Sequence, residues 1–239
     1  MLSPEMTQIL RVLHTGAGAG LDDDCVSALG MDHLVVSLVV EDRITEQLWS
    51  SDLVGSAFED LQFTLGQGPG PDALRLGRAI VEPDLTAMGA DRWPLLVPAM
   101  THLRAQAVFC FPLALGGITV GILTALRASP GHMGGQQMDD ALGLAAALTL
   151  QFLGGRGARF ETWLEAQPDG DLHRAVVHQA TGMLSVQLAL PLGEALLRMR
   201  AYAYSHDRSI IETAEDVVAR RLRLDDDRPE PESPKETKG

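Results

Sequence analysis

Three consecutive apolar patterns with the spacing of amphipathic helices fill residues 171–224, and they make this part of the chain helical. Asp171 is a suitable N-cap for the first helix, and Pro191 suits the first turn of the second. The Ser-Ile-Ile-Glu sequence from Ser209 is a capping box for the third. Helices this short are not stable alone and must pack together. We therefore predict a small all-α domain of three helices, followed by a charged, proline-rich tail at 225–239 that is disordered.

The chain before this segment carries the signals of β-structure. Residues 33–40, HLVVSLVV, are rich in β-branched side chains and predict a strand. Residues 106–115 and 118–127 predict two further strands, joined by a Gly-Gly turn into a hairpin. A long helix with an apolar stripe follows at 136–153. This order of elements predicts an α+β domain in which helices flank an antiparallel sheet.

These elements divide the chain into five predicted segments. They are an N-terminal helix and linker (1–20), the α+β domain (21–153), a linker (154–170), the three-helix domain (171–224) and the tail (225–239).

Charge is distributed unevenly along the chain. The net charge is −13, which by itself argues against a nucleic-acid partner. Residues 1–170 contribute −11, residues 171–224 contribute +1 and the tail contributes −3. The basic side chains are thus relatively concentrated in the three-helix domain. If the protein binds a polyanion such as RNA, this is the segment whose charge opposes binding least.

Several classes of function find no support in the residues. No window offers the roughly 18 uninterrupted apolar residues of a spanning helix, and the N-terminus lacks a signal-peptide pattern, so we expect a cytoplasmic protein with no membrane partner. Cys25 and Cys110 have no metal-ligand spacing and are expected to be buried thiols. The GQGPG sequence at 66–70 lacks the Lys-Ser/Thr of a phosphate loop and predicts a turn. Because no catalytic or metal-binding motif is found, we expect a binding protein that is not an enzyme and uses no metal or cofactor.

The α+β domain resembles a GAF domain over roughly residues 20–153. The resemblance is carried by HLVVSLVV, by LGQGPGPDAL leading to VEPDL, and by the hairpin FPLALGGITVGILTALR before a C-terminal helix. GAF domains are sensors that bind small molecules between the sheet and its loops, or dimerisation domains. The resemblance implies an unidentified small-molecule ligand, for which the candidate pocket walls are Phe63, Trp93, Phe109 and Phe111. Packing in the hydrophobic core is the alternative, and favoured, explanation for each of these side chains.

The three-helix domain resembles an ANTAR domain, the RNA-binding output module of transcription antitermination regulators. The resemblance rests on HQATGML, EALLRMRAYAY and SIIETAEDVV, one pattern in each helix. It implies RNA contacts from the RMRAYA segment and the turn after it. Arginine binds phosphate and stacks on unpaired bases, and tyrosine offers a flat surface for a base. The candidate RNA-binding residues are Arg198, Arg200, Tyr204 and Arg208, with Arg174 as a further outward-facing cation.

Three functions remain open at this point. The main hypothesis is a homodimeric, signal-responsive regulator that binds RNA stem-loops in a nascent transcript and promotes antitermination. The alternative is a protein-interaction or dimerisation regulator that no longer binds RNA, because Thr181 stands where the family usually has Lys. DNA binding through a helix-turn-helix is disfavoured by acidic residues in the third helix. The homodimer is expected from the apolar face of the 136–153 helix, whose alternative role is to cover its own sheet.

Overall fold

The computed structural model describes residues 1–15, 21, 23–40, 43–89, 91–153, 174–206 and 208–224. The chain forms two compact units, Met1–Ala175 and Val176–Gly239. The predicted linker at 154–170, the predicted N-cap Asp171 and the predicted disordered tail at 225–239 lie outside the described residues.

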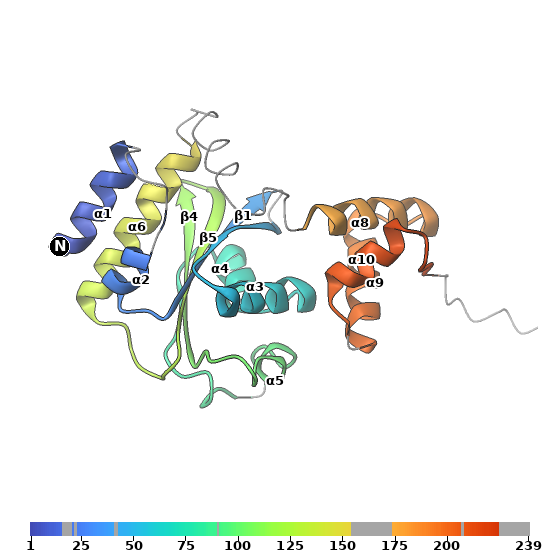
Figure 1. The fold of residues 1–239 in the computed structure, drawn as a ribbon, viewed down its shortest axis with the longest axis horizontal. Helices are drawn as coiled ribbons and strands as arrows, with labels where there is room; N and C mark the ends of the chain where they lie inside the picture. The colour runs from blue at the N-terminus through green and yellow to red at the C-terminus, as the bar shows by residue number, and fades with distance from the viewer. Residues whose placement is uncertain are drawn as a thin grey trace, which may run out of the picture. The chain divides into compact units, whose positions relative to one another are not determined.

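The first unit is built on a five-stranded antiparallel sheet with the strand order β2-β1-β5-β4-β3 (Figure 1). The predicted hairpin is present, and Gly116 in its turn has a φ of 61°, a left-handed conformation that glycine adopts without strain. The α+β class with an antiparallel sheet is therefore confirmed. The strands are β1 (His33–Val40), β2 (Arg43–Ser50), β3 (Ile80–Glu82), β4 (Ala107–Leu115) and β5 (Ile118–Arg127).

Helices cover both faces of this sheet. One group, α1, α2 and α6, lies on one face, and α3, α4 and α5 lie on the other (Figure 1). The helices of the first unit are α1 (Pro4–Thr15), α2 (Asp23–Leu29), α3 (Leu53–Leu65), α4 (Pro69–Leu76), α5 (Leu96–Ala99) and α6 (Gly135–Leu153).

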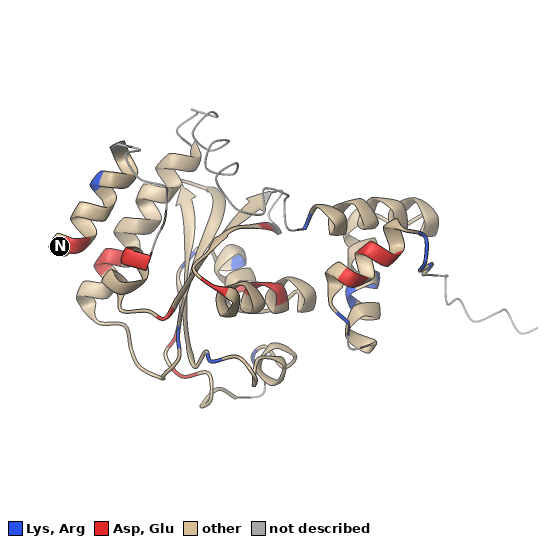
Figure 2. Cartoon of the chain, viewed as in Figure 1, with Lys and Arg blue, Asp and Glu red and all other residues tan. Residues whose placement is uncertain are grey.

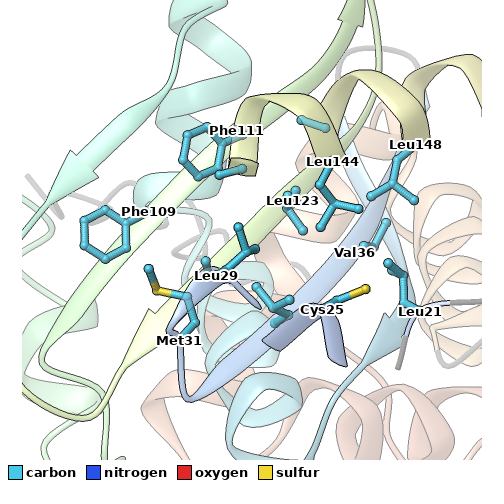
Figure 3. Packing of buried hydrophobic residues seen from close by; sticks show 14 of the residues in the cluster. Leu21, Cys25, Leu29, Met31, Val36, Phe109, Phe111, Leu123, Leu144 and Leu148 are labelled. Atoms are coloured by element: carbon cyan, nitrogen blue, oxygen red, sulfur yellow. The ribbon is translucent and has the colours of Figure 1, made fainter. Parts of the chain in front are cut away.

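The strands separate two hydrophobic cores because successive side chains point to opposite faces. On β4, Phe109 and Phe111 belong to the core under α1, α2 and α6, which we call the α6-side core (Figure 3). Val108 and Cys110, on the same strand, belong to the core under α3, α4 and α5, the α3-side core. A residue's parity along a strand therefore decides which core it enters.

Within the GQGPG sequence, residues 66–68 form the turn between α3 and α4, and Pro69 and Gly70 begin α4. Gly66 ends α3 in the left-handed conformation, with a φ of 65°. Gly68 has a φ of 143°, and a Cβ there would lie 2.5 Å from the side-chain oxygen of Gln62. The Gly70 N–H donates a hydrogen bond of 2.8 Å to that same oxygen. The turn is thus fastened to α3 and fixes the orientation of Gln62.

The described residues of the second unit form three helices. The first is α8 (Ala175–Leu188), whose first residue is the last residue of the first unit. The others are α9 (Leu192–Ser205) and α10 (Ile210–Val218). The capping box at the start of α10 is present as predicted, with the Ser209 hydroxyl accepting from the Glu212 N–H at 3.1 Å and the Glu212 carboxylate accepting from the Ser209 N–H at 3.3 Å. Val177, Met199 and Ala214 are buried in the interior of this unit, one from each helix.

Candidate functional sites

A buried polar network lies in the otherwise apolar α3-side core. Glu59 on α3 is 1% exposed, and its Oε1 accepts hydrogen bonds from the Thr124 hydroxyl at 2.7 Å and from Gln62 Nε2 at 3.1 Å. The Cys110 sulfur lies 3.5 Å from the same Thr124 oxygen. The Ser37 hydroxyl faces the carboxylate without meeting hydrogen-bond geometry. One helix and three strands therefore hold a carboxyl group at the centre of the sheet.

Burial changes the protonation of this network. Burial raises the pKa of Glu59 above its usual range, because the charged form loses its hydration. The positive charge of Arg174 and the hydrogen bond from Thr124 lower the Glu59 pKa, but they do not cancel the effect of burial. Burial also raises the pKa of the Cys110 thiol far above its usual range. Cys110 is therefore a neutral thiol at physiological pH, as the sequence predicts for a buried cysteine.

Arg174 is buried in the first unit and does not face outward. It is 0% exposed, and its Nη2 donates to Asp60 Oδ1 at 3.1 Å. Its guanidinium carbon lies 4.0 Å from the centroid of the Phe63 ring, and its backbone N–H donates to Glu46 Oε2 at 2.9 Å. The expectation that Arg174 faces outward is therefore wrong, because acidic and aromatic side chains of the first unit enclose it.

The four predicted pocket aromatics do not line one cavity. Phe109 and Phe111 lie in the α6-side core, on the far face of the sheet from α3 (Figure 3). Trp93 lies in the α3-side core, where its Nε1 donates to Asp72 Oδ2 at 3.0 Å. Phe63 is on α3 beneath the Arg174 guanidinium. All four side chains are buried, as the favoured explanation of core packing predicted. They cannot line one pocket, because period-two alternation places the two β4 aromatics on the other face.

Two of the predicted RNA-binding residues lie together on α9. Arg200 and Tyr204 are four residues apart, so they share one face of the helix. Tyr204 is 55% exposed and Arg200 is half-buried. Arg198 is exposed and lies on a different side of the helix, because two residues correspond to a rotation of about 200°. The structure thus brings Arg200 and Tyr204 together and separates Arg198 from them.

Arg208 is held by an ion pair within its own unit. Its Nη2 lies 2.6 Å from Asp216 Oδ2, and Arg221 Nε lies 2.7 Å from the other oxygen of the same carboxylate. The hydrogen bond to Asp216 raises the pKa of Arg208, and the two arginines lower the pKa of Asp216. This arrangement neutralises part of the acidic character of α10, which is visible in Figure 2.

Thr181 occupies an interior position of α8. It is 6% exposed, and its hydroxyl donates to the Val177 carbonyl oxygen at 2.7 Å. In this chain, position 181 is therefore part of the packing between helices, and its side chain does not lie on an exposed basic face.

Arg220 and Arg223, after α10, are not among the predicted RNA contacts, but both lie beside a groove. Arg220 and Arg223 line an open groove of about 640 Å³ together with α8 residues that include Gln179 and Gln187. Arg220 has a φ of 59°, a turn conformation that directs the chain back toward α8. Arg220 and Arg223 follow the C-terminus of α10, and only the fold shows that they border a groove.

Two further findings concern other classes of site. Among the described residues, no group of three His, Cys, Asp or Glu side chains could hold a metal ion. Within the same residues, no single helix is both long and apolar enough to cross a membrane, and only the pair α8 and α9, bent by 106°, meets that test by length and composition.

Comparison with known proteins gives structural likenesses only. No protein-family model matches the sequence, and no curated protein matches it. The GAF domain of a phosphoenolpyruvate-protein phosphotransferase from Acinetobacter has a TM-score of 0.46 at 12% identity, over 64% of this chain and 93% of that chain. The corresponding GAF domain from Coxiella burnetii has a TM-score of 0.40 at 15% identity, over 65% and 98%. A free methionine-R-sulfoxide reductase from Neisseria meningitidis has a TM-score of 0.47 at 18% identity, over 64% and 89%. With TM-scores below 0.5, these likenesses carry no conclusion about what this chain binds.

Proposed function

We propose that this protein is a signal-responsive regulator in which the first unit is a GAF-type sensor of a small molecule. In the proposal, the second unit is an ANTAR-type domain that binds RNA stem-loops and promotes transcription antitermination. The protein acts as a homodimer and has no enzymatic activity. A cytoplasmic location follows from the proposal, because nascent bacterial transcripts are made there.

Two groups of arginines in the second unit, one on α9 and one after α10, are the observation that carries this proposal. Arg200 and Tyr204 share a face of α9, and this pairing of a cation with a flat aromatic ring suits phosphates and unpaired loop bases. Arg220 and Arg223 add two cations beside a groove. Every basic residue in 1–224 is arginine, which binds phosphate through a fork of N–H donors.

A mobility-shift assay of the full chain with RNAs that carry paired stem-loops tests this proposal. Wild-type protein should bind saturably, and its affinity should fall with salt because binding to phosphates releases counterions. Tyr204→Ala should weaken binding by about 1–3 kcal/mol, which is the usual contribution of one stacked base. Tyr204→Phe should retain most of the affinity, and Arg200→Ala should reduce the salt slope by about one.

Arg78→Ala is the matched control for charge. Arg78 is exposed in the first unit, so its removal changes net charge as much as Arg200→Ala does but leaves the second unit intact. Equal losses in the two variants would indicate non-specific electrostatic attraction. Equal competition by duplex DNA would support a helix-turn-helix function and count against an RNA stem-loop target.

A protein-interaction regulator is the second candidate. The ion pair between Arg208 and Asp216 favours it, because this cation is already neutralised within the chain. If folded wild-type protein binds no stem-loop RNA at low salt, and the isolated residues 174–224 also bind none, this candidate replaces the first.

The proposed homodimer involves the outer side of α6. Leu144 and Leu148 are buried in the α6-side core, so this helix does cover its own sheet, as the alternative interpretation predicted. On the same helix, Leu142 is 49% and Leu150 is 63% exposed. Sedimentation of Leu142→Glu and Leu150→Glu variants tests this interface. Monomers would support it, and dimers of unchanged affinity would rule it out.

A further inference from the structure

Arg174 occupies an unusual position for an arginine. It is the largest of the fully buried side chains in the described residues, and it directly precedes α8, the first helix of the sequence segment assigned to output. Arginine is rarely fully buried unless its charge is paired. The contacts of this guanidinium therefore describe a site that accepts a cation in the interior of the first unit.

The site around the guanidinium combines an aromatic ring with carboxylates. The Phe63 ring lies beneath the cation, with 4.0 Å between the guanidinium carbon and the ring centroid. Asp60 accepts from Nη2 at 3.1 Å, and Glu59 lies close enough for the charge of Arg174 to affect its pKa. Figure 2 shows these acidic residues of α3. A ring face together with carboxylates is the usual protein environment for a guanidinium or ammonium group.

Arg174 satisfies this site only in part. Its Nε and Nη1 are buried and find no hydrogen-bond partner among the described residues, and the same holds for Oε2 of Glu59. A side chain optimised only for stability would not leave two charged donors and a carboxylate oxygen unpaired at once. Two donor nitrogens of Arg174 and one carboxylate oxygen of Glu59 are therefore unpaired in the same site, within the described part of the chain. A cation placed differently from Arg174 could donate a hydrogen bond to the Glu59 oxygen that Arg174 does not reach.

We propose that this acidic, aromatic-walled site is the sensor's ligand site, that its ligand is a small guanidinium compound, and that Arg174 occupies it as an internal substitute when the ligand is absent. The proposal rests on the sensing function proposed above and names the ligand class. Binding would place the ligand's guanidinium over Phe63 and against Asp60 and Glu59. Arg174 would leave, and its backbone hydrogen bond to Glu46, 2.9 Å long, would break. The chain would then be released at the residue directly before α8.

Chemical rescue of an arginine-deletion variant tests the site. Arg174→Ala in the full chain should unfold at a lower temperature than wild type, because it leaves Asp60 and the buried Glu59 without a neighbouring cation. Millimolar ethylguanidinium should raise the melting temperature of this variant saturably, since a ligand that binds only the folded state stabilises it. N-Ethylurea, which has a similar shape but no charge, should have no effect. Ethylammonium tests whether a positive charge alone is enough to stabilise the variant. It should raise the melting temperature less than ethylguanidinium does, because it lacks the planar fork of N–H donors.

Two variants in the same background show where the probe binds. Arg174→Ala/Asp60→Asn should lose the rescue, because the carboxylate that accepts from the guanidinium is gone. Arg174→Ala/Asp72→Asn is the matched control, since Asp72 belongs to the α4 region and contacts Arg75 and Trp93 instead. Rescue that persists in the Asp60 variant would overturn the proposal, as would equal rescue by N-ethylurea.

Hydrogen exchange on wild-type protein decides the question if Arg174→Ala does not fold. Ethylguanidinium should speed exchange of the Arg174 amide, whose hydrogen bond to Glu46 it breaks, and should leave exchange at the β4–β5 hairpin unchanged. No change at saturating probe would overturn the proposal. Because neither assay contains RNA, a negative result here leaves the RNA-binding proposal intact. A positive result without RNA binding would instead identify a cation sensor with another output.

Discussion

The guanidinium of Arg174 stacks on the ring of Phe63, with 4.0 Å between its carbon and the ring centroid, although the two residues are 111 positions apart in the chain. From sequence, Phe63 was a candidate wall of a ligand pocket and Arg174 a candidate RNA contact. The structure joins them in one buried site. Arg174, which directly precedes α8, thus shares its environment with the carboxylates of α3.

Glu59 makes the stability of the first unit depend on pH. Because burial raises its pKa in the folded state above the unfolded value of 4.5, the folded state holds the proton more tightly. Stability contributed by Glu59 is therefore present at low pH and is lost as pH rises from about 4.5 through the folded pKa. Glu59→Gln removes this loss. We expect the melting temperature of Glu59→Gln, relative to wild type, to increase between about pH 5 and pH 8.

The matched control for that measurement is Glu5→Gln, in the exposed first turn of α1. Its melting temperature should follow wild type across the same pH range. A Glu59→Gln difference that is constant with pH would show that Glu59 does not titrate differently in the folded and unfolded states.

Neither cysteine should react in the folded protein. Cys25 is 1% and Cys110 is 0% exposed, and burial keeps the Cys110 thiol protonated. The thiolate is the reactive form, so a disulfide reagent should modify no thiol in native protein and both after denaturation. Rapid modification of Cys110 without denaturant would show that the α3-side core opens on the time scale of the reaction.

Gly121 should be intolerant of a side chain. A Cβ there would lie 2.7 Å from the Ser37 carbonyl oxygen on the neighbouring strand β1 and 3.0 Å from a Leu113 methyl carbon. Because backbone cannot move aside cheaply, Gly121→Ala should destabilise the first unit by about 1–3 kcal/mol in denaturant unfolding. Gly117→Ala is the matched control, since nothing lies within 4 Å of a Cβ at that position, and its effect should stay within about 0.5 kcal/mol.

The capping box of α10 should contribute measurably to the second unit. Ser209→Ala removes the acceptor for the Glu212 N–H, and loss of such a cap costs about 1 kcal/mol. Hydrogen exchange in α10 should accelerate by roughly five-fold, the rate equivalent of that free energy, and α6 should be unaffected. Ser27→Ala, at an exposed position within α2, is the control, and it should leave hydrogen exchange in α10 and α6 unchanged. Equal acceleration in all helices after Ser209→Ala would mean that the effect is global unfolding.

Local patterns predicted most elements of this fold. The β4–β5 hairpin, the strand at 33–40 and the cap at Ser209 all depend on residues close together in the chain, and each is present. The turn predicted at 66–70 is present at 66–68, and its last two residues begin α4. The two cysteines are buried as expected. The RNA-binding role of Arg200 and Tyr204 stays a prediction, because side-chain placement on α9 establishes proximity and not a partner.

The candidate ligand site could not be predicted in the same way. Thr124 and Glu59 are 65 residues apart and Arg174 and Asp60 are 114 apart, so no periodicity relates them. Phe109 and Phe111 are buried as favoured from sequence, but the core that they enter could not be predicted either. Alternation shows that both side chains share one face of β4, but it does not say which helices cover that face.

The sequence by itself determined the type and approximate position of the β4–β5 hairpin, the strand at 33–40, the long helix α6 and the three C-terminal helices, and it predicted an antiparallel sheet. Caps, glycine turns and hydrophobic periods act between near neighbours, so these features can be predicted locally. Only the tertiary structure decided that Arg174 is enclosed by α3 and β2, that Glu59 is held protonated more strongly than a free carboxyl, and that Arg220 and Arg223 border a groove. These properties depend on burial and on charges brought together across long stretches of chain, and such long-range contacts are decided when the whole core packs.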